Sequence, residues 1–366
     1  MVTKPPPGAN ESISGFAIRL QIPNFRSNVS FNQMGIEALM SPVDPSLSRR
    51  RFLQSSSAAM LAGLGLTSLP RSARAADYPE PVPQAANLTP YLNKGRLIFR
   101  WNDLSLGAYR TGTDLKYPYF YPLNGLQSNL PLTTESAEPY PHHRGLWLGC
   151  DPLNGANYWS DGPVEQGQIQ STSLELKGEP TETSFTFTNA CQWVGPNDSQ
   201  PFSDEREFTI TILDDRSWAI DANLIVTATD DVEIARAKHS FFALRCAPDI
   251  APMYGGTLMN SEGGIGAKGT YGKPAKWCGY HGQRKGNPDI VEGIAIMNHP
   301  ENFDGDCPWF TREYGHLSPS PFEFLKEPYR MQKGEKLPLR YRVVMHTGTP
   351  AEAGLDQIYE NWLANV

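Results

Sequence analysis

The chain has 366 residues, with 39 Asp or Glu against 32 Lys or Arg, and its formal net charge at pH 7 is −7. An acidic chain without a basic tract after residue 75 argues against binding to nucleic acid or to anionic membranes, and favours small neutral or cationic ligands. Its length is sufficient for one large core or for two closely packed sheets.

An export signal is the first predicted element. Three consecutive arginines, residues 49–51, precede the small and apolar stretch 55–69, and residues 73–75 form an A-x-A cleavage site. This order predicts a twin-arginine signal peptide, and the apolar run of about 15 residues is short for a spanning helix. We therefore expect residues 1–75 to be a leader and the mature protein, beginning near Ala76, to be periplasmic or secreted. The leader holds eight Lys or Arg and three acidic residues, so the mature chain keeps 24 basic and 36 acidic residues.

A Pro-rich lead-in, residues 76–95, is followed by segments that are typical of strands. They are short, rich in β-branched and aromatic residues, and alternate between apolar and polar positions. The clearest are residues 96–101, 184–188, 207–213, 218–227 and 339–345. Alternation of this kind predicts antiparallel sheets that each have one face towards solvent.

One helix is predicted, at residues 350–364, where Pro350 and acidic residues precede apolar residues at helical spacing. We therefore predict an all-β fold for residues 96–366, which form a single antiparallel β-sandwich domain with a short C-terminal helix. Two forms stay open, a jelly roll and a supersandwich like that of the galactose mutarotases.

The chain contains five cysteines, and none of them forms a C-x-x-C pair. This excludes the common zinc-ribbon and thioredoxin patterns. Two interpretations remain, namely buried free thiols or one disulfide that forms after export.

The most informative motif is Pro141-His142-His143-Arg144-Gly145-Leu146-Trp147. Neighbouring side chains of a strand point to opposite faces, so two adjacent histidines converge on one ligand only in an irregular segment. The flanking Pro and Gly favour such a segment. A second group of irregular segments rich in Gly, His, Asn and Arg lies between residues 237 and 321. Loops of this kind carry sites on rigid β scaffolds.

Together these segments resemble a known family. They are YPYFYPLNGL from Tyr117, HHRGLW, NSEG, GKPAKW, GIAIMNHP and the stretch 309–315. The chain resembles the secreted PmoA family of unknown function, which is often labelled methane oxygenase and is common in bacteria that degrade polysaccharides. The resemblance covers roughly residues 97–346 and implies an all-β exported protein. Relatives place a histidine at the position of Phe310 and an aspartate at that of Asn298, which implies that this chain has exchanged catalytic groups.

Acid–base catalysis on a sugar requires a carboxylate or an imidazole, together with a cation for the developing oxyanion. The residues predicted to catalyse are His142, His143, Arg144, His239, Glu262, His299 and Arg312. The residues predicted to bind the substrate are Asn260, Trp147, Tyr119, Trp277 and Tyr314. Structural alternatives stay open for two of the candidates. Glu262 could be a turn residue that pairs with Arg245 or Lys276, and Arg312 could pair with Glu313 or Glu323.

No cofactor is predicted, although a metal is conceivable because imidazole is a common metal ligand. Its ligands would come from His142, His143, His239 and His299, which lack an H-E-x-x-H or facial-triad spacing.

Three functions follow in order of preference. The first is a carbohydrate-active enzyme of lyase, epimerase or hydrolase type. The second is a non-catalytic sugar-binding or accessory protein, and the third is a copper or other redox-metal protein, as the family label suggests. The expected partner is a small molecule or an oligosaccharide, with no nucleic acid and no membrane after signal cleavage.

Overall fold

The computed structural model describes residues 87–303 and 305–365. The predicted leader with its twin-arginine signal, residues 1–75, lies outside these residues, and so does most of the lead-in. The boundaries at residues 75 and 95 therefore stay predictions. The last part of the lead-in, residues 88–93, forms the first strand.

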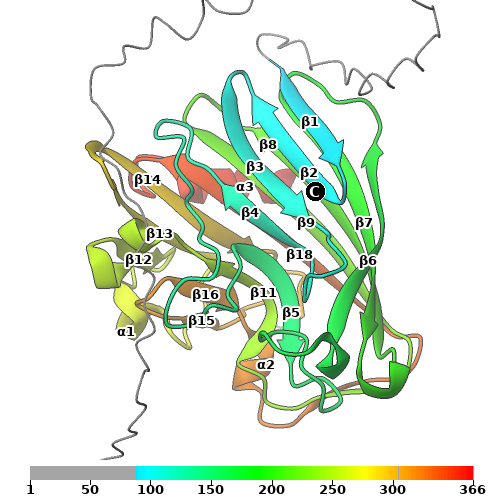
Figure 1. Ribbon diagram of the computed structural model, residues 1–366. Coiled ribbons are helices and arrows are strands. Elements are labelled where there is room, and N and C mark those ends of the chain that lie inside the picture. The colour runs from blue at the N-terminus through cyan, green and yellow to red at the C-terminus, as the bar shows by residue number, and fades with distance from the viewer. Residues whose placement is uncertain (1–86, 304, 366) are drawn as a thin grey trace, which may run out of the picture. The chain divides into compact units, whose positions relative to one another are not determined.

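The first of two large sheets in the described part of the chain has eight strands, all paired antiparallel (Figure 1). In spatial order they are β1 (Leu88–Asn93), β2 (Arg96–Trp101), β3 (Leu104–Arg110), β4 (Tyr119–Leu123), β5 (Leu146–Asp151), β11 (His239–Arg245), β16 (His316–Pro319) and β15 (Trp309–Thr311). The pairing of β5 with β11 joins segments that lie far apart in the sequence.

The second sheet also has eight antiparallel strands among the described residues. Their spatial order is β12 (Thr257–Asn260), β13 (Trp277–Arg284), β14 (Asn287–Asn298), β18 (Lys336–Thr347), β9 (Ser217–Ala228), β8 (Phe202–Ile212), β7 (Ser184–Val194) and β6 (Gln168–Lys177). A short separate ladder pairs β10 (Val232–Ile234) with β17 (Tyr329–Met331). The predicted all-β antiparallel sandwich is confirmed, and every predicted strand overlaps a strand of these sheets.

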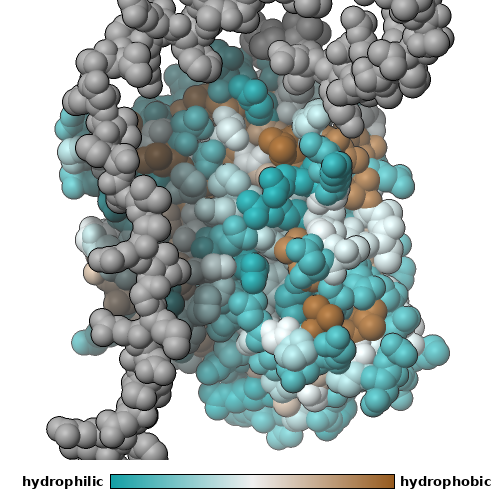
Figure 2. Space-filling model, viewed as in Figure 1, coloured by the Kyte–Doolittle hydropathy of each residue, from teal (hydrophilic) through white to brown (hydrophobic). Residues whose placement is uncertain are grey.

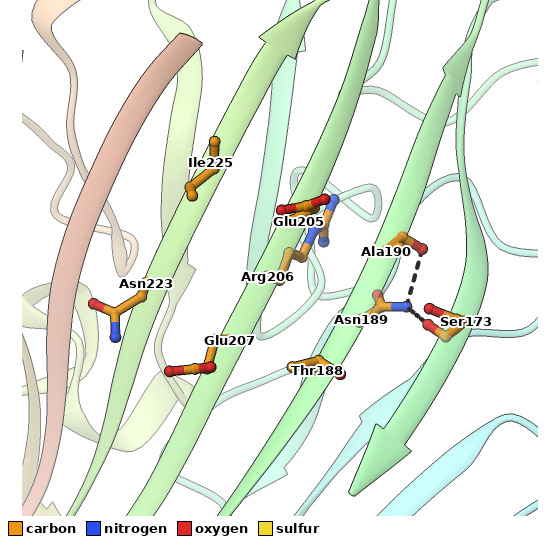
Figure 3. Close-up of a pocket in the computed structure, with 9 residues that line it drawn as sticks. All are labelled: Ser173, Thr188, Asn189, Ala190, Glu205, Arg206, Glu207, Asn223 and Ile225. Atoms are coloured by element: carbon orange, nitrogen blue, oxygen red, sulfur yellow. Dashed lines mark hydrogen bonds between the residues drawn. The ribbon is translucent and has the colours of Figure 1, made fainter. Parts of the chain in front are cut away.

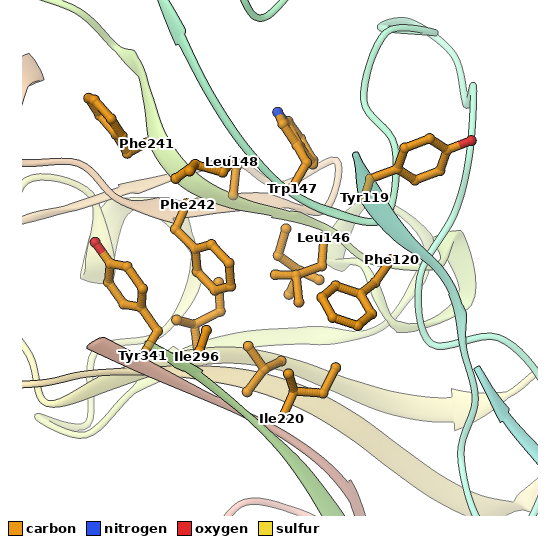
Figure 4. Close-up of a cluster of buried hydrophobic side chains, with 14 of the residues drawn as sticks. Tyr119, Phe120, Leu146, Trp147, Leu148, Ile220, Phe241, Phe242, Ile296 and Tyr341 are labelled. Atoms are coloured by element: carbon orange, nitrogen blue, oxygen red, sulfur yellow. The ribbon is translucent and has the colours of Figure 1, made fainter. Parts of the chain in front are cut away.

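Alternation of side chains builds the core between the two sheets. Figure 4 shows Phe120, Leu146 and Phe242 of the first sheet on the same side as Ile220 and Ile296 of the second, whereas Trp147 points away. All of these side chains are buried. We call the face of the first sheet that carries Trp147 its outer face. Because Trp147 is buried although it points away from the second sheet, loops must cover this face.

The predicted C-terminal helix is confirmed as α3 (Leu355–Ala364). It begins five residues after Pro350, since Gly354 immediately before it has a φ of 65°, which is not helical. Its buried residues Leu355, Tyr359 and Trp362 belong to a small apolar cluster with Trp277 of the second sheet.

The remaining helices are single turns. They are α1 (Gly266–Thr270), α2 (Pro321–Phe324) and the 3₁₀ turns Val164–Gln166, Pro196–Asp198, Pro248–Ile250 and Pro252–Tyr254. In the described part of the chain, no helix is long and apolar enough to cross a membrane.

The surface is mostly hydrophilic on the side seen in Figure 2, where hydrophobic residues form small separate groups. Scattered apolar residues of this kind are normal for a protein surface. In the interior, the thiols of Cys150, Cys191, Cys246 and Cys278 are free and buried. Burial raises the pKa of each of these thiols, so they remain protonated and unreactive.

Candidate functional site

Four histidines gather on the outer face of the first sheet, where β5, β11 and β16 are neighbours. Strand register places two of them together, since His239 pairs with Asp151 and Ala243 with Trp147, while Arg245 pairs with His316. The other two, His142 and His143, come from the loop before β5. We define the imidazole cluster as His142, His143, His239 and His316 together with the rings packed on them, Trp147, Trp159 and Tyr314.

The centre of the cluster is a stacked pair of imidazoles. The rings of His143 and His316 are 4.6 Å apart and nearly parallel, and both side chains are buried. Burial, together with the nearby charges of His142 and Arg245, lowers the pKa of His143 to about 2. Burial likewise lowers the pKa of His316 well below its usual value. Both rings are therefore neutral at pH 7.

Arg245 fixes the tautomer of His143. Its Nη1 lies 3.4 Å from His143 Nδ1. A guanidinium can only donate, so Nδ1 accepts and the ring proton of neutral His143 is on Nε2.

The two less buried histidines, His142 and His239, lie on the side of the cluster that is nearer to solvent, and we call this side its mouth. His239 Nδ1 lies 3.6 Å from Asp151 Oδ2, and both side chains are about one quarter exposed, at 27% and 26%. The His239 ring stacks on Trp159 at 5.4 Å. His142 contacts the edge of His143 at 4.6 Å and is partly exposed. Burial is the main cause that lowers the pKa of His142, and the charges of His239 and Arg144 add to it.

Arg144 lies beside this mouth and is held by acidic residues. Its Nη2 donates to Asp161 Oδ1 at 2.9 Å, and its Nη1 is 3.8 Å from Glu135. The Tyr119 hydroxyl also donates to Glu135. Gly145, the next residue, has a φ of 64°, and a Cβ there would clash with the carbonyl oxygen of Phe120. Glycine is therefore required where the loop that carries the histidines enters β5.

Two further arginines flank the turn before β16. Arg245 is buried, its Nη2 donates to the carbonyl of Glu138 at 3.0 Å, and its guanidinium lies 4.6 Å from the Tyr314 ring centroid. The Arg312 guanidinium lies 3.9 Å from the centroid of Phe310 and 5.0 Å from that of Tyr271. Burial raises the pKa of Tyr314 to about 12, so its hydroxyl is a donor at neutral pH.

Several buried nitrogen atoms around the cluster have no partner among the described residues. They are Lys116 Nζ, Arg144 Nε, Trp147 Nε1, Trp159 Nε1, Arg245 Nε and both ring nitrogens of His316. Buried polar groups in folded proteins are normally hydrogen-bonded to protein or to water. These nitrogens therefore mark a place where water or a ligand completes the structure.

Most of the predicted site residues meet at this cluster. The structure brings together His142, His143, Arg144, His239, Trp147, Tyr119, Tyr314 and Arg312. Arg312 pairs with neither Glu313 nor Glu323. Glu313 accepts from the amide of Ala267, and Glu323 pairs with Arg236.

The other predicted residues lie on the second sheet, beside α3 or in the turn after β12. Trp277 Nε1 donates to Asp356 of α3 at 2.7 Å, and the His299 ring contacts Trp362 at 5.3 Å. Asn260 Oδ1 accepts from the amides of Glu262 and Gly264.

Glu262 is an exposed turn residue. Its carboxylate accepts from the Ser261 hydroxyl at 3.0 Å, whereas Lys276 pairs with Glu360. Among the residues that the structure describes, no hydrogen bond or ion pair of Glu262 reaches the cluster.

Metal ligation gains no support from this geometry. Within residues 87–303 and 305–365, no group of three or more His, Cys, Asp or Glu side chains is arranged so that it could hold a metal ion. In particular, His299 packs on α3 and not on the other three histidines.

Four residues of the site were not predicted from the sequence, namely Asp151, Trp159, Arg245 and His316. Both Arg245 and His316 are close in the sequence to predicted residues. Arg245 ends the strand that begins at His239, and His316 follows Tyr314 by two positions. Their role depends on the pairing of β11 with β16, which the sequence pattern does not encode locally.

A separate concavity lies on the second sheet. It has a volume of about 400 Å³ and is lined by residues of β6 to β9. Figure 3 shows Glu205, Glu207, Asn223 and Thr188 along it. Glu207 is ion-paired with Lys177, and the lining contains no aromatic ring and no imidazole. The imidazole cluster is therefore the stronger candidate for a chemical site.

Comparisons with known proteins add the following. A search of curated proteins found no match. Among solved structures, the GalM/aldose epimerase homologue from C. elegans is similar, with 10% identity and a TM-score of 0.30 over 72% of this chain and 99% of that one. A polysaccharide lyase is similar at 10% identity and a TM-score of 0.26 over 72% of this chain and 33% of that one. A family model matches residues 96–360, and the chain therefore belongs to the family of unknown function DUF6807.

Proposed function

We propose that the chain is a carbohydrate-active enzyme that moves protons by imidazole acid–base catalysis at the imidazole cluster. The observation that carries this proposal is the mouth of the cluster, where His142 faces solvent with a lowered pKa and His239 is paired with Asp151. A neutral imidazole can accept a proton at pH 7, and a second imidazole held by a carboxylate can return one.

Each group at the mouth has a role in this scheme. His142 is the base, because burial and the charges of His239 and Arg144 keep it neutral. His239 is the acid, oriented by Asp151 at 3.6 Å. Arg144, held by Asp161 at 2.9 Å, adds positive charge beside these imidazoles, which favours formation of an anion on the substrate. Abstraction of a proton from carbon is the step that lyases and epimerases share, whereas most glycoside hydrolases use two carboxylates.

A sugar is favoured as substrate by the composition of the site. Indole and phenol rings surround the imidazoles, and flat aromatic faces suit the apolar faces of pyranose rings. The unpartnered nitrogens supply donors for hydroxyl oxygens. The resemblance of the sequence to a family from polysaccharide-degrading bacteria points in the same direction.

Exchange of carbon-bound hydrogen is the direct test. The protein is incubated in deuterated water with a broad panel of mono- and oligosaccharides, including oxidised sugars, and exchange is followed by proton NMR. We expect exchange or product formation with at least one sugar. His142→Gln and His239→Asn should each reduce the rate by about 100-fold or more, the usual contribution of a general acid or base.

His281→Gln is the matched control, because His281 lies on β13 of the second sheet, and it should keep the full rate. If no sugar is exchanged or converted, or if His142→Gln is as active as the native chain, the proposal is wrong.

The pH profile supplies an independent readout. The base works only when deprotonated, so activity falls as the pH drops through the pKa of His142, which lies below its usual value. Arg144 lowers this pKa, and Asp161, which raises it, would lose its partner in Arg144→Gln. We expect the acidic limb of kcat/KM to move to higher pH in this variant. If the acidic limb of kcat/KM does not move in this variant, His142 is not the base.

A second candidate function is sugar binding without turnover. The complete burial of His143 and His316, and the apolar ring of Phe310 at 5.5 Å from His316, favour it. Saturable sugar binding that persists in the His142→Gln and His239→Asn variants, without any exchange, would support this alternative.

We also propose that the protein is exported by the twin-arginine pathway. The proposal rests on the arginines at 49–51 and the apolar stretch that follows them. Cell fractionation should find the native chain in the periplasm or the medium, and replacing Arg49 and Arg50 by lysine should retain it in the cytoplasm. Equal export of both forms would contradict the proposal.

A further inference from the structure

Buried arginines differ in their partners within the described part of the chain. Three are buried, namely Arg206, Arg245 and Arg284. Arg206 Nε donates to Asp204 at 2.6 Å, and Arg284 lies 3.3 Å from Glu292 and 3.4 Å from Asp249. Arg245 pairs with no carboxylate of the described residues, and its partners are a carbonyl oxygen and the Nδ1 of His143. A buried cation without a counter-ion is costly and calls for one.

Arg312 is a second guanidinium without a carboxylate partner among the described residues. It is partly exposed, and among the described residues its Nη1 donates only to the carbonyl of Thr311 at 3.0 Å and its guanidinium lies over aromatic rings instead of a carboxylate. Both guanidiniums flank the turn that contains Tyr314 and precedes His316. Burial lowers the pKa of His316 and the charges of both arginines lower it further, and the same charges oppose the rise that burial causes in the pKa of Tyr314. The two arginines therefore create a local positive potential at one end of the cluster.

The orphaned atoms point to the same chemistry. Arg245 Nε, Trp147 Nε1 and Trp159 Nε1 can only donate, and all three are buried without a partner in the described part of the chain. A lining of unpartnered donors is complementary to a group that offers several acceptors and no hydrogens, as a carboxylate does. The chain as a whole is acidic, which favours neutral or cationic ligands. The positive charge at this end of the cluster is a local exception and favours an anionic group.

We propose that the substrate of this site is a uronic acid, either free or within an oligosaccharide, with its carboxylate between Arg245 and Arg312. The proposal rests on the proposed function and names its substrate class. A proton on the carbon next to a carboxylate becomes acidic enough for an imidazole when cations neutralise that carboxylate. In the step itself, the C–H bond breaks, its proton goes to His142, and the electron pair is delocalised into the carboxylate held by the arginines.

One loop segment contacts Arg245 and its neighbour Tyr314. The Glu138 carbonyl accepts a hydrogen bond from Arg245 Nη2, and the Tyr140 ring packs on the Tyr314 ring at a centroid distance of 4.9 Å. Tyr140 itself is 40% exposed. The carboxylate of the ligand takes the place of the Glu138 carbonyl on the guanidinium, because a carboxylate adds the attraction of a full negative charge, which a neutral carbonyl does not have.

Calorimetry with matched ligands tests the proposal on the full-length chain. The ligands are trisaccharides of galacturonate, glucuronate and mannuronate, each compared with its neutral methyl ester. At least one acid should bind about tenfold more tightly than its ester, the contribution of a charge-assisted hydrogen bond. Arg245→Met and Arg312→Met should each reduce the preference for the acid over its ester.

Controls keep the outcomes distinct. Arg330→Met removes an exposed arginine that pairs with Glu233 and should preserve the preference for the acid. Arg312 is only partly buried, so its variant tests the proposal even if Arg245→Met does not fold. Equal binding of acid and ester, or a preference that survives both substitutions, overturns the uronic acid proposal and leaves acid–base catalysis on neutral sugars intact. If no sugar of either kind is bound or exchanged, the proposed function fails as well.

Discussion

Two buried polar networks of this molecule contrast in how far they satisfy their own hydrogen bonds. The first, the Arg206 network, lies between the sheets. Arg206 donates to both carboxylate oxygens of Asp204 at 2.6 and 2.9 Å, and Trp193 Nε1 donates to the same carboxylate at 2.6 Å. The Tyr109 hydroxyl donates to Asn189 at 2.8 Å. The donors and acceptors of the Arg206 network are thus paired with one another within the protein.

The imidazole cluster lacks this balance. Its buried cation, Arg245, has no carboxylate partner, and the indole nitrogens of Trp147 and Trp159 donate to nothing in the described protein. The pKa shifts follow the same division, since Asp204 outweighs the effect of burial and raises the pKa of Arg206, whereas burial lowers that of Arg245, although both guanidiniums stay charged. A network that completes itself stabilises the fold, whereas one that is left incomplete is available to a ligand.

Breaking the complete network should have the largest effect. Asp204→Ala leaves Arg206 and Trp193 without their acceptor in the core, which costs about 3–5 kcal/mol of unfolding free energy. Urea denaturation measures this loss. Asp221→Ala is the matched control, because it breaks the partly exposed pair with Arg342 and should cost much less. Equal losses would mean that burial of the Arg206 network does not matter.

Acid should destabilise the cluster by a smaller amount. Buried His316 stays neutral in the folded chain, surrounded by His143, His239, Arg245 and Arg312, whereas the unfolded chain takes up a proton below about pH 6.5. Its contribution to stability is complete above that pH and is lost as the pH falls towards the lowered folded pKa. Each histidine of this kind contributes a slope of about 1.4 kcal/mol per pH unit.

His316→Phe tests this slope. The two ring nitrogens have no partner among the described residues, so the substitution should flatten the pH dependence of the urea midpoint between pH 6 and pH 4 by the contribution of one histidine. Above pH 7 the slope should be unchanged. An unaltered slope in the acidic range would show that His316 is protonated in the folded chain.

Removing the unpaired cation should change stability least among the buried sites. Arg245→Met loses the bond to the Glu138 carbonyl but also removes a buried charge, so the unfolding free energy should change by less than about 1 kcal/mol, in either direction. Urea denaturation beside Asp204→Ala gives the comparison directly. A loss as large as that of Asp204→Ala would place Arg245 among the structural residues.

The smallest effect is expected outside both networks. Glu262 was predicted from the sequence to be catalytic, but it is an exposed turn residue. Glu262→Ala should change the unfolding free energy by less than about 0.5 kcal/mol and should leave sugar turnover unchanged. A large loss of turnover would bring the turn after β12 back into the site.

The sequence predicted the parts of this structure that depend on local patterns. Alternation identified β2 at residues 96–101, and helical spacing identified α3. The motif around His143 was recognised because two imidazoles and a guanidinium between Pro and Gly serve no core. Asp151 and Arg245 were missed because their partners come from the pairing of β5 with β11 and of β11 with β16.

Two predicted site residues show the opposite limitation. His299 and Trp277 belong to segments rich in Gly, Asn and aromatic residues, so composition grouped them with the site. Both side chains instead pack against α3, which forms from the end of the chain. Composition detects irregular loops but cannot say on which sheet they lie.

The pairing of β5 with β11 also has a kinetic consequence. It places residue 147 beside residue 243, and contacts of such long sequence separation form slowly. The stack of Trp159 on His239 at 5.4 Å exists only once these strands have met. Indole fluorescence should therefore report closure of the first sheet during refolding, as a late phase that His239→Ala removes.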